Sequence, residues 1–148
     1  MTDEPRIFAL TDDLDRHEAL LAAAEPVHRQ LRPALPADYV RFMRQVFAGG
    51  AEMAALLAGE RIATVAVYRC HPTTAHGHRF YIDDLVTDEA DRGRGFGRRM
   101  LDWCEERARA RGCASLDLES GVQRQSAHRF YFREGFVIAS FGFRKALR

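Results

Sequence analysis

The chain has 148 residues, of which 47% are hydrophobic and 29% are charged. This composition is typical of globular proteins and the length fits a single domain over residues 1–148, which excludes disordered, collagen-like and coiled-coil classes. Lysine and arginine total 22, aspartate and glutamate total 21, and the formal net charge is +1. A chain so balanced lacks the basic field that attracts nucleic acids, so we expect no nucleic-acid partner.

The amino terminus shows no cationic segment followed by a long apolar stretch, which is the pattern of a secretory signal. No run approaches the roughly 18 apolar residues of a membrane-spanning helix. We therefore expect a cytoplasmic protein with no membrane partner. The cysteines Cys70, Cys104 and Cys113 have no CxxC spacing, so the sequence predicts neither a disulfide framework nor a metal site.

The first third of the chain predicts a strand followed by two helices. Residues 6–10 form the strand candidate, and the oxygens of residues 11–13 can cap a helix that continues toward Leu31. A second helix is expected over residues 36–47, because Gly49 and Gly50 follow its last apolar residue.

The middle of the chain changes from helical to strand patterning. Short apolar runs at residues 53–57 and 62–68 flank Gly59-Glu60 and predict a β-hairpin. The polar segment 73–78 predicts a turn, and residues 80–86 predict a third strand.

The last third predicts a helix, a strand, a second helix and a terminal strand. Apolar residues recur at helical spacing from Phe96 until Gly112, and alternate with polar ones over 114–118. A helix over 126–134 and a strand over 136–143 follow. The predicted order is β-αα-βββ-α-β-α-β, an α/β (α+β) chain.

A turn rich in glycine and arginine precedes the helix that starts near Phe96. Three glycines within five residues permit positive φ angles and a close approach of the backbone to a ligand; they are Gly93, Gly95 and Gly97. Their N–H groups can converge on an anion at the helix N-terminus. Four arginines reinforce the positive charge: Arg92, Arg94, Arg98 and Arg99. A phosphate-bearing ligand is the natural partner.

The glycine spacing separates the nucleotide motifs. A Walker loop requires a lysine, and this turn has none. A dinucleotide fingerprint requires a glycine where Arg98 stands, although Asp117 lies at a distance suited to a ribose-binding acid, so that alternative stays open.

The pattern Arg92-x-x-Gly95-x-Gly97 resembles the signature of the GNAT superfamily of acyl-CoA-dependent N-acyltransferases. Residues 81–87 look like that family's fourth strand, and residues 127–136 look like its C-terminal helix and turn. The resemblance implies a GNAT-like mixed, mostly antiparallel sheet flanked by helices. It also implies acetyl-CoA as co-substrate, no metal, and a homodimer as a plausible assembly.

The resemblance implies two sets of cofactor contacts. Backbone amides from Gly93 to Arg98 would bind the diphosphate, and the strand backbone before the turn would pair with the pantetheine arm. The implied cofactor-binding residues are Leu85, Val86, Thr87, Arg92, Gly93, Arg94, Gly95, Phe96, Gly97 and Arg98.

Tyr131 occupies the position that looks like the family's general acid. A tyrosine with a pKa near 10 is protonated at pH 7 and can give its proton to a departing thiolate, whose pKa is near 8.5. The alternative is a tyrosine that only packs beside Phe130.

Carboxylates are the candidates for activating the amine. An alkylamine with a pKa of about 10.4 is neutral in roughly one molecule in 2,500 at pH 7, a deficit of about 4.6 kcal/mol. By resemblance Asp83 is the first candidate for base or amine anchor, and Glu119 is the second. Asp83 and Asp84 should lie on opposite faces of their strand unless a bulge turns both to one face.

The acceptor itself is not identified by the sequence. Asp83, Asp84 and Glu119 favour a cationic small-molecule or peptide amine, such as a polyamine, an aminoglycoside or a lysine side chain. The leading hypothesis is an N-acetyltransferase in which the amine attacks acetyl-CoA directly in a ternary complex. The alternative is a non-catalytic acyl-CoA-binding or interaction domain of the same fold.

Overall fold

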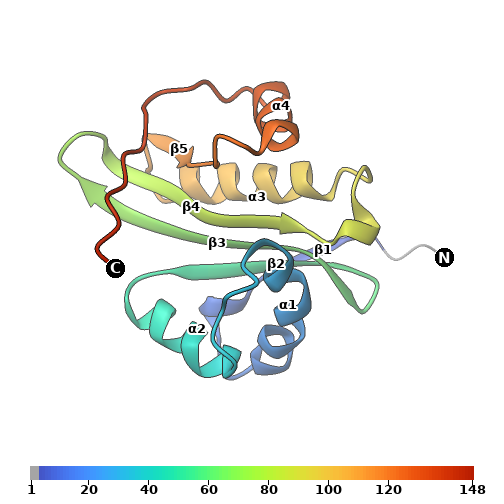
Figure 1. The fold of residues 1–148 in the computed structure, drawn as a ribbon. Coiled ribbons are helices and arrows are strands. Elements are labelled where there is room, and N and C mark those ends of the chain that lie inside the picture. Colours follow the sequence, from blue (N-terminus) through green and yellow to red (C-terminus); the bar gives the residue numbers. More distant parts are fainter. Residues whose placement is uncertain (1–3) are drawn as a thin grey trace. The chain divides into compact units, whose positions relative to one another are not determined.

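The computed structural model describes residues 4–148, which are built from a sheet and four α-helices (Figure 1). In chain order the elements are β1 (Arg6–Ala9), η1 (Leu10–Asp12), α1 (Glu18–Leu31), α2 (Tyr39–Ala48), β2 (Glu52–Ala58), β3 (Arg61–Thr73), β4 (Gly77–Thr87), η2 (Glu89–Asp91), α3 (Phe96–Ala110), β5 (Ser115–Leu118) and α4 (Gln125–Arg133). The chain forms two compact units, one ending at Asp117 and one spanning Leu118–Arg148. The single domain over residues 1–148 stays a prediction.

The sheet has the strand order β1-β2-β3-β4-β5. The pairs β1–β2, β2–β3 and β3–β4 are antiparallel. The backbone N–H of Ala114 donates to the carbonyl of His78 at 2.8 Å, so β4 and β5 begin at the same end and run in the same direction. The mixed, mostly antiparallel sheet predicted from the sequence is confirmed.

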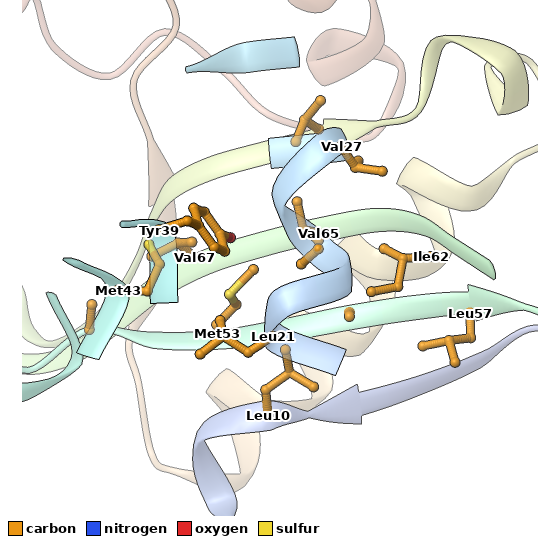
Figure 2. Packing of buried hydrophobic residues seen from close by; sticks show 14 residues of the cluster. Leu10, Leu21, Val27, Tyr39, Met43, Met53, Leu57, Ile62, Val65 and Val67 are labelled. Atoms are coloured by element: carbon orange, nitrogen blue, oxygen red, sulfur yellow. The ribbon is translucent and has the colours of Figure 1, made fainter. Parts of the chain in front are cut away.

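Helices α1 and α2 cover one face of this sheet (Figure 1). Leu21, Ala24 and Val27 of α1 are buried because their spacing places them on one side of the helix. They pack with Met43 of α2 and with Val65 and other apolar residues of the central strands (Figure 2). This core holds α1 against β3 and β4.

Helix α3 covers the opposite face of the sheet (Figure 1). Its buried residues recur at helical spacing, as predicted: Phe96, Met100, Leu101, Cys104 and Ala108. Beneath it the rings of Tyr68 and Phe80 stack at a centroid distance of 4.7 Å, and Trp103 meets Tyr68 edge-on at 5.9 Å. Cover on both faces explains why five consecutive apolar residues of β2, Met53–Leu57, are buried.

Two predicted boundaries differ from the structure. The first helix begins at Glu18, because Asp13 accepts a hydrogen bond from the backbone N–H of Arg16 and so favours a local turn over an earlier helix start. The hairpin of β3 and β4 continues to the pair Thr73–Gly77, so the turn predicted over 73–78 is shorter and spans residues 74–76. Its polar residues suit an exposed ribbon as well as a turn.

The predicted terminal strand over residues 136–143 is wrong. The structure gives this segment no regular secondary structure, and Val137, Ile138, Phe141 and Phe143 are exposed. Its aromatic and β-branched residues supply strand propensity but no partner, and none of the described ladder pairs includes this segment. Within residues 4–148, no helix has the length and apolar character needed to cross a membrane.

Candidate functional site

The glycine-rich turn forms the N-terminal end of α3. Gly93 and Gly95 have φ angles of 80° and 81°, a conformation that residues with a Cβ rarely adopt. The first N–H that bonds back into the helix is that of Arg99, which donates to Gly95 O at 3.1 Å. The N–H groups of Phe96 and Gly97 therefore lack a partner within the helix and lie at its positive end. This geometry suits an anion.

The side chain of Asp91 stabilises the glycine-rich turn through hydrogen bonds to two arginines. It is buried, and it accepts hydrogen bonds from Arg94 Nη1 and Arg61 Nη2, each at 2.8 Å, with Arg61 Nη1 as a further donor. Hydrogen bonds from Arg61, and then from Arg94, hold the pKa of Asp91 below its usual value despite burial. The sequence analysis missed this anchor, because Arg61 is 30 residues away in the chain.

The side chains of this turn that were predicted to bind the cofactor differ in burial and in their contacts. Arg94 is committed to Asp91, and its guanidinium lies 4.8 Å from the Phe96 ring centroid. Phe96 is buried, so its side chain belongs to the core and only its backbone faces a ligand. Arg92 and Arg98 are exposed beside the turn.

The second half of β4 has an edge with which no strand of residues 4–148 pairs. Leu85, Val86 and Thr87 pair with β3 on one side, and Thr87 Oγ1 lies 3.0 Å from Thr64 Oγ1. On the other side β5 starts level with the first residues of β4, and its 4 residues cannot follow the 11 of β4. Backbone groups of residues 85–87 are thus available to a peptide-like ligand.

Strand β4 has a β-bulge at the two adjacent aspartates, Asp83 and Asp84. Asp84 pairs with Val67 but Ile82 pairs with Tyr68, so Asp83 is the extra residue. Asp84 contacts His28 of α1, and Asp83 contacts Arg69, which in turn reaches Gly49 at the end of α2. Both carboxylates therefore lie on the face of the sheet that α1 and α2 cover. The sequence had left open that a bulge could turn both to one face.

The carboxylate of Asp84 is held by His28 and Arg32. Its Oδ2 accepts from Nε2 of the buried His28 at 2.7 Å, and its Oδ1 accepts from Arg32 Nε at 2.7 Å. Burial alone would raise the pKa of Asp84, but the hydrogen bonds from His28 and Arg32 outweigh it and lower the pKa. Nδ1 of His28 is 2.9 Å from the hydroxyl of Tyr39. Both oxygens of Asp84 thus accept a hydrogen bond within the protein, and its predicted role as a substrate contact stays a prediction.

Asp83 is less constrained. Its Oδ2 accepts from Arg69 Nε at 2.8 Å, its side chain is 28% exposed, and its Oδ1 has no partner among the described residues. The sequence analysis missed Arg69, His28 and Arg32, since nothing local to Asp83 or Asp84 indicates partners up to 56 residues away.

Tyr131 lies in the second unit, on α4. It is half-buried, and its ring packs against Phe136 and Phe130 at centroid distances of 5.6 Å and 5.4 Å. Burial raises the pKa of Tyr131, with the charge of Arg124 opposing the rise. A raised pKa keeps the phenol protonated at neutral pH, as a proton donor requires.

Glu119 also belongs to the second unit, where it is exposed. A Cβ added at Gly142 would lie 3.5 Å from its Oε2, so the backbone at Gly142 runs beside this carboxylate. The role of Glu119 as the second base candidate stays a prediction.

Two other chemistries concern Asp117 and metal binding. Oδ2 of Asp117 accepts hydrogen bonds from Arg79 Nε at 2.9 Å and Ser115 Oγ at 2.6 Å, and the role of a ribose-binding acid stays an open alternative. Over residues 4–148, no group of three or more His, Cys, Asp or Glu side chains is arranged to hold a metal ion.

Known proteins resemble this chain in sequence. It is 44% identical over 70 residues to the uncharacterized N-acetyltransferase YhdJ of Bacillus subtilis, covering 47% of this chain and 49% of that protein. It is 42% identical over 66 residues to the aminoalkylphosphonate N-acetyltransferase of Salmonella typhimurium, covering 45% of this chain and 43% of that one. In these matches the chain spans about half the length of the relatives.

Solved structures share the fold. The aminoglycoside N-acetyltransferase AAC(6')-Iy in complex with CoA superposes with a TM-score of 0.79 at 13% identity, over 98% of this chain and 94% of that one. The model of the acetyltransferase (GNAT) family matches residues 17–136. The order of elements, the glycine turn at the start of α3 and this match agree, and the chain belongs to the acetyltransferase (GNAT) family.

Proposed function

We propose that this protein is an acetyl-CoA-dependent N-acetyltransferase that acts on a primary amine. The observation that carries the proposal is that two binding elements follow each other in the chain. They are the edge of β4 at residues 85–87 and the start of α3, which suits an anion. One element suits a diphosphate and the other a peptide-like arm, and CoA contains both groups in that order. Relatives that are named N-acetyltransferases support the reaction class.

The residues at the glycine turn fit the diphosphate. The N–H groups of Phe96 and Gly97 have no partner within α3. Gly93 and Gly95 leave open space where a Cβ would stand, and Arg92 and Arg98 supply positive charge nearby. Backbone groups of Leu85–Thr87 would pair with the amides of the pantetheine arm, which leaves the thioester near the bulge at Asp83.

The reaction is a direct transfer. The amine nitrogen forms a bond to the carbonyl carbon of the thioester, the carbon–sulfur bond breaks, and the sulfur leaves with the electron pair. In this proposal Tyr131 gives its hydroxyl proton to the sulfur; its pKa is raised by burial, so the phenol is protonated at neutral pH. The proton that the amine loses goes to a carboxylate or to water.

Asp83 is the carboxylate that we propose for the amine. Its free Oδ1 can accept a hydrogen bond from the amine, whereas both oxygens of Asp84 are occupied. Glu119 remains the second candidate. A cytoplasmic location and a homodimer stay predictions of the sequence.

The test is a screen of amines for release of free thiol from acetyl-CoA by the full chain. Release that depends on the amine, with one acetylated amine formed per thiol, supports the proposal. If the folded protein binds acetyl-CoA tightly and no amine in a broad panel releases thiol, the proposal fails and the alternative, a non-catalytic acyl-CoA-binding domain, takes its place.

A further inference from the structure

We propose that the acceptor is an amine that also carries an anionic group, and that Arg32 and Arg69 bind this group beside the bulge of β4. The inference rests on the proposed function, which it makes more specific. It replaces the purely cationic acceptor that the carboxylates alone had suggested.

Arg32 follows the last residue of α1 and reaches the bulge from that helix. Its Nε donates to Asp84 Oδ1 at 2.7 Å, and its Nη2 donates to the carbonyl of Asp83 at 3.2 Å. These bonds fix the plane of the guanidinium. The side chain is 52% exposed and Nη1 has no partner among the described residues, so donors remain for a ligand.

Arg69 approaches Asp83 from β3. Its Nε donates to Asp83 Oδ2 at 2.8 Å and its Nη1 to the carbonyl of Gly49 at 3.1 Å. The side chain is 36% exposed, and Nη2 has no partner within residues 4–148. Arg69 is therefore also held in one orientation while keeping a free donor.

The two guanidinium groups bracket one residue, since both bond to Asp83. An oriented guanidinium is well suited to a carboxylate or phosphonate, because its planar donors match two acceptor oxygens and little side-chain entropy remains to be lost. The unpaired Oδ1 of Asp83 lies within the same cluster and suits an ammonium or amine N–H. The cluster thus presents acceptor and donor groups together, as a zwitterionic ligand requires.

The balance of charge around Asp83 and Asp84 also favours an amine that carries an anionic group. The carboxylates of Asp83 and Asp84 are each paired with an arginine, so their attraction for a polycation is largely cancelled. An acceptor with several positive charges would meet two guanidinium groups at this position. An amine with one anionic group meets complementary charge at both of its ends.

The experiment compares matched amines in the thiol-release assay. We expect kcat/KM for 2-aminoethylphosphonate and β-alanine to exceed that for ethanolamine and propylamine by about tenfold to a hundredfold, the range for one or two charge-assisted hydrogen bonds. Arg32→Gln and Arg69→Gln should each raise KM for the anionic amines about tenfold more than KM for the uncharged-tail amines.

Arg41→Gln serves as the control, because it removes the same charge from an exposed position on α2. Circular dichroism checks that each variant folds, and the comparison of amines on the unaltered protein needs no variant. Turnover of amines without preference for the anionic ones overturns this inference and leaves the proposed function intact. An equal KM increase for both classes of amine in the arginine variants also overturns it. If no amine releases thiol, both this inference and the proposed function are wrong.

Discussion

Tyr131 is the residue on which turnover depends in this account. Replacing it with phenylalanine keeps the ring contacts with Phe136 and Phe130 and removes the proton donor. We expect Tyr131→Phe to lower kcat by about a hundredfold or more while the Kd for acetyl-CoA stays within about twofold. Steady-state thiol release and calorimetry measure the two quantities.

The control for this variant is Phe132→Leu, an exposed position on the same helix. It should leave both kcat and Kd unchanged. Since burial raises the pKa of Tyr131, the loss of kcat from ionisation of this group should appear only above its ordinary value of about 10. An unaltered kcat in Tyr131→Phe removes this residue from the mechanism.

Asp84 is expected to contribute stability more than catalysis. Its folded-state pKa is lowered, so the stabilisation it provides is complete above the unfolded value of about 3.9 and is lost as the pH falls through the lower folded value. Asp84→Asn leaves His28 and Arg32 without their anionic partner. We expect a loss of about 3 kcal/mol in the free energy of unfolding at pH 7.

Urea denaturation at pH 7 and at pH 3 measures this effect. The difference between the unaltered protein and Asp84→Asn should shrink at pH 3, because this pH lies below the unfolded pKa and the unfolded chain then binds a proton that the folded carboxyl binds less readily. Asp102→Asn, at an exposed position on α3, should change the unfolding free energy by less than about 0.5 kcal/mol. A difference that is the same at both pH values would show that the charge of Asp84 contributes nothing.

At the scale of elements, the start of α3 determines the affinity for the cofactor. Gly95 caps the helix with a φ of 81°, so Gly95→Ala strains the turn from which the helix N–H groups project. We expect it to cost about 1–2 kcal/mol of stability and to raise the Kd for CoA by about tenfold.

Gly112→Ala is the matched control, because Gly112 has a φ of 72° at the other end of the same helix. It should cost a similar amount of stability without changing the Kd for CoA. A Kd that rises equally in both variants would mean that the turn acts only through the stability of α3.

Periodic elements were predictable from the sequence, and their partners were not. Helix α3 was predicted closely, because a dozen residues repeat one apolar spacing that only a helix satisfies. The segment over 136–143 is rich in Phe, Val and Ile, which favour strands, yet a strand depends on a neighbour that local sequence does not specify.

The same difference applies to the candidate site. The glycine turn could be predicted, because its conformation depends on adjacent residues. The contacts of Asp83 and Asp84 with His28, Arg32 and Arg69 could not, because they depend on a one-residue bulge and on how α1 packs against β4.

For the whole molecule, the proposed binding groups and the proposed acid belong to different parts of the chain. The glycine turn and the edge of β4 lie in the unit that ends at Asp117, and Tyr131 lies in the unit that begins at Leu118. Cofactor affinity and turnover should therefore respond to different substitutions. With a net charge of +1, attraction for a diphosphate must come from the local arrangement at α3 and not from the protein as a whole.

The most direct measurement is calorimetry of the folded full chain with CoA and with pantetheine, which lacks the diphosphate. If N–H groups at the start of α3 bind the diphosphate, CoA should bind with one molecule per chain, and pantetheine should bind at least about a hundredfold more weakly. Absence of binding to CoA, or equal affinity for the two ligands, would contradict the account.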